Sequence, residues 1–160
     1  LSPLVTLRDA RTADAELLLT WRNDPQTRRW SRSRREIGAE EHASWLRHVL
    51  ADSSTRLWVA ETNGTPIGDV RVGPRTAEET AEVHIVLAPD ARGRGLGAAV
   101  LMQIAARALA DPYLTTLYAH VKPENDASLR AFARAGFHTA GTDDDGLLRL
   151  ERQPHKTKGE

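Results

Sequence analysis

The chain contains no cysteine, no net charge and no long apolar run, and each absence excludes a class of protein. Without cysteine there can be no disulfides, no thiolate metal site and no cysteine-bound covalent intermediate. The 22 basic and 22 acidic side chains balance, which argues against a nucleic-acid-binding polycation and against an acidic tail protein. No apolar stretch reaches about 18 residues, so we expect no membrane span. We also expect no signal peptide, since no basic start precedes an apolar segment, and a cytoplasmic location is the simplest reading.

The length of 160 residues fits one domain, which we place at residues 1–152, followed by a polar tail at 153–160. The hydrophobic periodicity predicts strands at 4–7, 56–61, 66–72, 82–87, 114–121, 137–140 and 147–151. It predicts helices from Thr12 to the Asn23-Asp24-Pro25 stop, and at 40–50, 96–109 and 126–135, with residues 22–38 irregular outside the first helix. Asn63-Gly64 marks a hairpin, and Gly136 closes the last helix. This order is neither strict βαβ alternation nor all-β, and it predicts an α+β fold with a mixed sheet.

A glycine-rich segment at residues 92–97, Arg-Gly-Arg-Gly-Leu-Gly, separates an apolar β-type run at 83–87 from the longest predicted helix. Glycines allow positive φ and a close approach of the backbone to a ligand. The start of a helix adds free N–H groups and the positive end of the helix dipole. This layout favours binding of an anion such as a pyrophosphate. The alternative is a plain tight turn into a helix.

The same residues resemble the acetyl-CoA signature of the GNAT superfamily of N-acetyltransferases, Arg/Gln-x-x-Gly-x-Gly/Ala between a strand and a helix. The segment Asn125-Asp126-Ala127-Ser128, with Ala135-Gly136-Phe137 after it, resembles the second signature of that family. The resemblance implies a GNAT-like α+β fold whose mixed central sheet carries helices on both faces. It also implies direct transfer of an acetyl group from acetyl-CoA to a primary amine in a ternary complex.

The resemblance further implies which residues bind acetyl-CoA. Backbone amides from Arg92 to Ala98 would hold the pyrophosphate, the backbone of Leu87 would pair with the pantetheine arm, and Asn125 would anchor its end. The full set is Leu87, Arg92, Gly93, Arg94, Gly95, Gly97, Ala98 and Asn125. The chain departs from the family pattern at Phe132, where many members carry a tyrosine that protonates the leaving thiolate. Ser128, a water molecule or Tyr118 are the alternatives for that role.

Removal of a proton from the acceptor amine requires a base, because an alkylammonium has a pKa near about 10. Glu82 and His84 lie two residues apart in a predicted strand and therefore share one face. We expect Glu82 first and His84 second to act as base, with Ser128 the third candidate catalytic residue. The alternative explanation is that Glu82 and His84 simply lie on a side of the strand that faces solvent. No His/Asp/Glu cluster has metal-ligand spacing, so no metal is predicted.

The front half resembles two GNAT branches, acetyltransferases of amino-sugar nucleotides and N-terminal acetyltransferases of ribosomal proteins. The resemblance lies in Trp21-Arg22-Asn23-Asp24-Pro25 and in Glu41-His42-x-x-Trp45. Residues 22–35 hold six arginines and one acid, which suggests an acceptor with an anionic group, although a solvated loop explains the run equally well. The predicted acceptor-binding residues are Trp21, Arg22, Asn23, Trp30 and His42, whereas Trp45 is interpreted as helix packing.

Several functions therefore remain open from the sequence. Among acceptors, an amino-sugar nucleotide comes first, then a protein N-terminus, then a small amine such as an antibiotic. A non-catalytic acyl-CoA-binding module is the main alternative to an enzyme. A dinucleotide-binding oxidoreductase is disfavoured, because the strand after the glycine loop's helix ends at Val121-Lys122-Pro123 without the expected carboxylate. We expect a monomer or homodimer that binds neither nucleic acid nor membrane.

Overall fold

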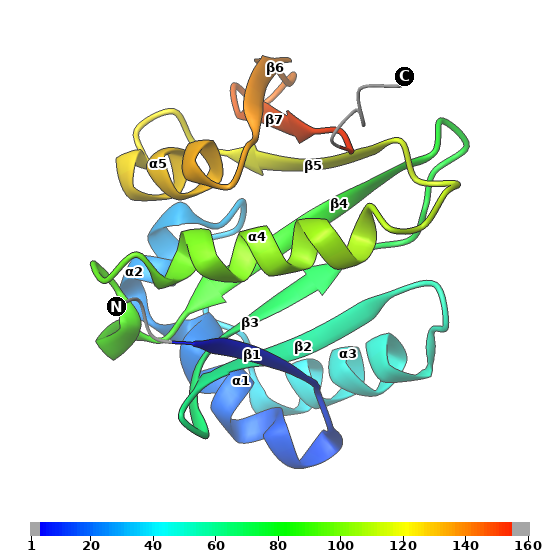
Figure 1. Cartoon of the computed structure of the whole chain (residues 1–160). Helices are drawn as coiled ribbons and strands as arrows, with labels where there is room; N and C mark the ends of the chain where they lie inside the picture. Colours follow the sequence, from blue (N-terminus) through cyan, green and yellow to red (C-terminus); the bar gives the residue numbers. More distant parts are fainter. Residues whose placement is uncertain (1–3, 155–160) are drawn as a thin grey trace, which may run out of the picture.

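The computed structural model describes residues 4–154 and contains a seven-stranded mixed sheet, in the order β1-β2-β3-β4-β5-β7-β6 (Figure 1). The strands are β1 (Val5–Asp9), β2 (Arg56–Thr62), β3 (Thr65–Val72), β4 (Thr80–Leu87), β5 (Thr116–Val121), β6 (His138–Thr142) and β7 (Leu148–Arg152). Neighbouring strands are antiparallel except β4 and β5, which are parallel. The α+β prediction with a mixed sheet is confirmed.

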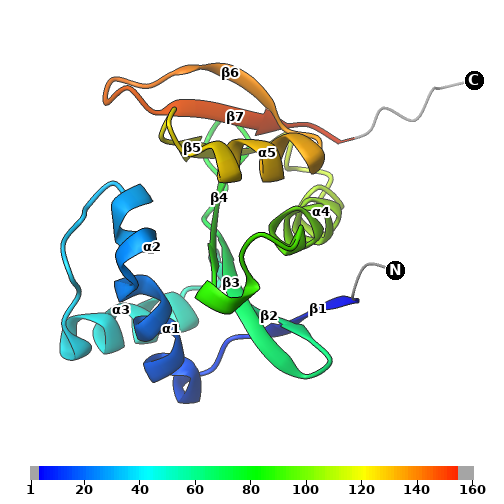
Figure 2. The ribbon, with the colours of Figure 1, turned by 90° about the vertical axis from the view of Figure 1, so that its left-hand side faces the viewer.

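Helices cover both faces of the sheet (Figure 2). They are α1 (Ala15–Asn23), α2 (Pro25–Trp30), α3 (Ala39–Ala51), α4 (Leu96–Ala108) and α5 (Asp126–Arg134), with short 3-10 turns η1 (Thr12–Asp14) and η2 (Pro89–Ala91). The alternation of β2 shows how the faces divide. Trp58 packs in the core under α4, whereas Leu57 and Val59 pack with Leu18 and Leu46 of α1 and α3. Successive side chains of β2 point to opposite faces of the sheet and therefore belong to two separate hydrophobic clusters.

The helix α2 corrects the prediction that residues 22–38 are irregular outside the first helix. Pro25 ends α1, as expected, but it also occupies the first turn of a new helix, where its missing N–H is no loss. The Asp24 carboxylate accepts hydrogen bonds from the backbone N–H groups of Gln26 and Thr27, at 3.1 and 3.2 Å. An N-cap of this kind stabilises a helix by about 1 kcal/mol, which supports a helix of only six residues.

Two predicted turns are present. Asn63 and Gly64 both have positive φ, 50° and 77°, and connect β2 to β3 as a hairpin. Gly136, with a φ of 90°, follows Ala135, the C-cap residue of α5. Of the predicted tail, residues 155–160 lie outside the described residues. Between residues 4 and 154, no helix has the length and apolar character needed to cross a bilayer.

The parallel pair β4 and β5 separates partway along its length. The two strands pair only where Thr80, Ala81 and Glu82 face Thr116, Leu117 and Tyr118. Beyond Glu82 the strands diverge, although β4 stays paired with β3 as far as Leu87. The sheet therefore opens at its centre, and residues 83–87 present an unpaired edge to that opening.

Candidate active site

A cavity of about 850 Å³ occupies the opening between β4 and β5. Because Val83 and Ile85 face α4 whereas His84 and Val86 face α1 and α3, the cavity has two walls of different character. We call one wall the donor side; it includes Leu87, Gly93, Gly95, Gly97, Asn125 and Ser128. The other is the acceptor side, which includes Trp30, His42, Trp45, Asp69, Arg71 and His84.

On the donor side, the glycine-rich turn presents a row of unused backbone donors. Gly93 and Gly95 adopt left-handed conformations, with φ of 72° and 74°. The N–H groups of residues 93–95 donate to no acceptor among residues 4–154. The next three N–H groups belong to the first turn of α4, where no intrahelical acceptor exists. Up to six donors and a helix dipole thus meet at one wall, which fits a pyrophosphate.

Arg92 holds the glycine-rich turn against α2. Its guanidinium donates to the Asp24 carboxylate at 2.7 Å, to Thr27 Oγ1 at 3.0 Å and to the Leu87 carbonyl at 3.3 Å. The side chain is therefore occupied by protein groups, as is the carbonyl of Leu87, whose backbone we expected to pair with pantetheine. A Cβ at Gly97 would be in van der Waals contact with Leu87 Cδ1, at 3.4 Å. Arg94 is exposed and makes a 3.5 Å contact to the Asp90 carbonyl.

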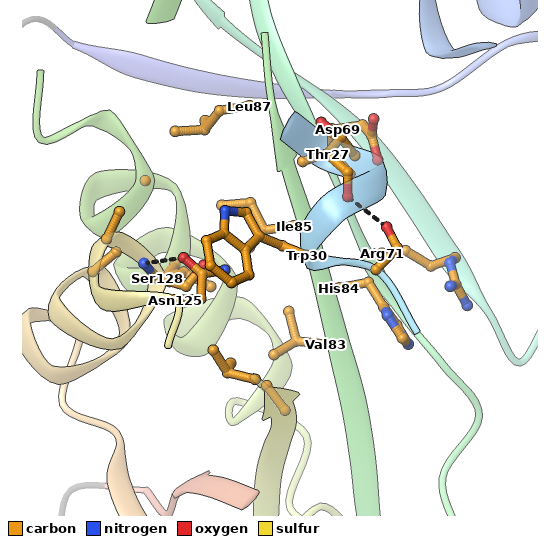
Figure 3. Close-up of a pocket in the computed structure, with 18 of the residues that line it drawn as sticks. Thr27, Trp30, Asp69, Arg71, Val83, His84, Ile85, Leu87, Asn125 and Ser128 are labelled. Atoms are coloured by element: carbon orange, nitrogen blue, oxygen red, sulfur yellow. Dashed lines mark hydrogen bonds between the residues drawn. The ribbon is translucent and has the colours of Figure 1, made fainter. Parts of the chain in front are cut away.

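Asn125 and Ser128 lie at the start of α5 on the donor side (Figure 3). The Asn125 side-chain oxygen caps this helix by accepting from the Ser128 N–H at 3.2 Å. The Asn125 amide nitrogen then remains a donor for a ligand. Phe132 is buried and packs edge-on against Phe137, with ring centroids 4.9 Å apart. Tyr118 does not line the cavity, whereas Ser128 does.

On the acceptor side, β3, β4 and β5 contribute a continuous group of charged and imidazole side chains. Glu82 Oε1 lies 2.5 Å from His84 Nε2, and Glu82 Oε2 lies 3.3 Å from His120 Nδ1. The hydrogen bond from His84 lowers the pKa of Glu82 to about 2, against the opposing effect of burial. His84 and His120 line the cavity, whereas Glu82 lies behind them.

The arginines of residues 22–35 are mostly bound to other groups of the chain. Arg28 donates to the carbonyls of Asn23 and Arg34, Arg32 pairs with Asp143 and Asp145, and Arg35 pairs with Glu41. Arg22 differs, because it lines the cavity and its NH1 is buried without a hydrogen-bond partner. Fewer of these arginines are therefore free to bind an anionic acceptor than the sequence suggests.

The structure places the predicted acceptor-binding residues in two groups. Trp30 and His42 line the cavity together with Arg22. Trp21 is buried in the core between α1, α3 and β2, and the Asn23 side chain exchanges two 2.8 Å hydrogen bonds with the backbone of Ile37. Neither Trp21 nor Asn23 lines the cavity, so their placement does not support the predicted contact with an acceptor.

The cavity residues that the sequence prediction missed include Trp45, Asp69, Arg71 and His120. Asp69 and Arg71 alternate with buried valines in β3, and this pattern alone puts them on one face. That this face lines a cavity together with residues of α2 was not visible, because α2 itself was not predicted. Within residues 4–154, no group of three His, Asp or Glu side chains could hold a metal ion.

Residues 5–138 match the family model described as an acetyltransferase (GNAT) domain. An aminoglycoside N(6')-acetyltransferase type 1 from Klebsiella pneumoniae is 28% identical over 152 residues, covering 86% of this chain and 76% of the relative. An N-acetyltransferase from Streptomyces griseus is 44% identical over 113 residues, covering 64% of this chain and 57% of the relative. The fold matches spermidine N-acetyltransferase from Vibrio cholerae, solved with CoA and spermine, at a TM-score of 0.85, 19% identity and coverage of 93% and 95%.

Proposed function

The chain belongs to the GNAT family of acetyl-CoA-dependent N-acetyltransferases, and we propose that its acceptor is a primary amine of an amino sugar. One observation carries the proposal: a single cavity joins the unused N–H groups of the glycine-rich turn to His84, which is paired with Glu82 behind it. Acetyl-CoA would supply a thioester-activated acetyl group, and the acceptor side of the cavity would supply polar groups and aromatic rings to bind the amino sugar.

The N–H groups of residues 93–98 would bind the pyrophosphate of acetyl-CoA, with the dipole of α4 behind them. Arg94 would add a contact to a phosphate. Arg92 would act indirectly, by fixing the turn through Asp24. The open edge of β4 at residues 83–87 would receive the pantetheine arm, and the Asn125 amide nitrogen would donate to it.

We assign the base to His84, which reverses the order expected from the sequence. Glu82 holds protons too weakly to deprotonate an ammonium efficiently, and it does not reach the cavity. His84 does reach the cavity, and its Nε2 is hydrogen-bonded to Glu82. Glu82 would then orient the imidazole and stabilise its protonated form, as carboxylates beside catalytic histidines do.

The leaving thiolate needs a proton donor other than Phe132. Ser128 lies in the first turn of α5 and lines the donor side of the cavity. We propose Ser128 for this role. The rings of Trp30 and Trp45 would contact the apolar faces of a sugar, and His42 packs against Trp45 at a centroid distance of 5.3 Å.

An acceptor screen with acetyl-CoA tests this function by measuring released CoA. The panel should contain glucosamine, UDP-glucosamine, kanamycin, spermidine and a peptide with a free N-terminus. Turnover with amino sugars above turnover with spermidine and the peptide is expected. Turnover confined to the peptide would replace the proposal by N-terminal protein acetylation. Acetyl-CoA binding without turnover over the whole panel would indicate a non-catalytic acyl-CoA module.

A further inference from the structure

Asp69 is a charged side chain that the acetyl-transfer scheme leaves without a role. It lies on β3, on the face of the sheet that His84 and Arg71 share, and lines the acceptor side (Figure 3). Asp69 is half-buried, and within residues 4–154 no side chain or N–H group forms a hydrogen bond or ion pair with its carboxylate. A carboxylate placed in a partly closed cavity without a partner is energetically unfavourable. An unpaired carboxylate of this kind suggests that a ligand supplies the missing hydrogen-bond donor or positive charge.

Arg71 is the nearest cation, yet it does not form an ion pair with Asp69. Its guanidinium lies over the Trp45 ring, 5.7 Å from the centroid, and interacts electrostatically with Asp69 and, more weakly, with Glu82. Burial raises the pKa of Asp69 to about 7, with only a partial opposing effect from Arg71. The carboxylate therefore lacks a positive charge at hydrogen-bond distance.

The strand register fixes the position of Asp69 relative to the proposed base. Arg71 is directly opposite His84 across the β3–β4 ladder, and Asp69 is opposite Val86. Asp69 is thus a diagonal neighbour of His84 on the same face, a relation that separates the residues by about 7–8 Å. One small ring can contact both side chains from above the sheet.

We propose that the Asp69 carboxylate binds a second ammonium group of the acceptor, so that the enzyme selects amino sugars that carry at least two amines. This inference rests on the proposed acetyl transfer beside His84 and narrows its substrate class. One amine would lie at His84 and react, while the other would remain charged and form a charge-assisted hydrogen bond with Asp69. An amino-sugar nucleotide with a single amine would leave Asp69 unpaired.

Two sugars that differ at one position test the proposal. The first is 2,6-diamino-2,6-dideoxyglucose, and the second is 6-amino-6-deoxyglucose, which has a hydroxyl in place of the 2-amine. The wild type should prefer the diamine by about tenfold or more in kcat/KM, as expected for a hydrogen bond between charged groups. Asp69→Asn keeps the shape but loses the charge, and should reduce this preference to about twofold or less. Asp145→Asn, which removes an exposed acid that pairs with Arg32, should keep the full preference.

Calorimetric titration of both sugars into CoA-saturated protein separates this inference from the proposed reaction. Tighter binding of the diamine to the wild type, lost in Asp69→Asn, supports Asp69 even if neither sugar is acetylated, an outcome that would reject the reaction instead. Equal binding of the two sugars to the wild type, no binding of either, or an unchanged preference in Asp69→Asn would overturn the inference.

Discussion

Glu82 Oε1 lies 2.5 Å from His84 Nε2, and of these two side chains only His84 lines the cavity. The register of β4 explains the difference. Glu82 is the last residue of β4 that pairs with β5, and its carboxylate lies between His84 and His120, whereas His84 lies where the strands have separated. His84 can therefore contact an acceptor, whereas Glu82 can act only through its hydrogen bond to His84.

Glu82→Gln should lower kcat by about 10²-fold, since a neutral amide cannot stabilise a protonated imidazole. His84→Gln should lower kcat by at least as much, because it removes the proton acceptor itself. The dissociation constant of acetyl-CoA, measured by calorimetry, should stay within about twofold in both variants, since neither residue lies on the donor side. A Glu82→Gln enzyme with wild-type turnover would remove this carboxylate from the mechanism.

Asp69→Asn should stabilise the protein, and by more at pH 8 than at pH 5. Burial raises the pKa of Asp69 from 3.8 to about 7, so the folded protein disfavours the charged carboxylate. This destabilisation begins as pH rises above the unfolded pKa and is complete above the folded one. The expected gain is about 1–3 kcal/mol at pH 8, after allowance for the partly open cavity. Thermal unfolding of both proteins at the two pH values measures it, and an equal difference at both would contradict the assignment.

Gly68→Ala should destabilise the sheet by about 1–3 kcal/mol, because the added methyl group would collide with the Val86 carbonyl. Gly73→Ala is the control, because Gly73 directly follows β3 and its N–H donates to the Glu82 carbonyl of β4. A Cβ at Gly73 would meet its nearest neighbour, the Glu82 carbonyl, at 3.8 Å, an ordinary contact. Urea unfolding should therefore separate the two variants. Similar stabilities would mean that β3 and β4 can move apart at Gly68.

The sequence allowed prediction of the features that depend on local periodicity and turn chemistry. The hairpin at Asn63-Gly64, the glycine-rich turn before α4 and the placement of Glu82 and His84 on one face all follow from such patterns. The helix α2 does not, since six residues are too few for a periodic signal. Its N-cap, Asp24, also binds Arg92 at 2.7 Å, a contact between residues 68 positions apart. The exposure of Asp69 and His84 to a shared cavity depends on that tertiary arrangement.

Gly95→Ala should weaken acetyl-CoA binding by about tenfold or more, through displacement of N–H donors to a charged group. Gly64→Ala is a control for backbone strain, because Gly95 and Gly64 have φ of 74° and 77° and neither has an atom within 4 Å of a Cβ position. Each substitution should therefore cost about 1–2 kcal/mol of stability. Only Gly95 lies in the cavity, so only its variant should lose affinity, as measured by calorimetry at a temperature where both variants are folded. Equal affinity in the two variants would show that the pyrophosphate does not bind at this turn.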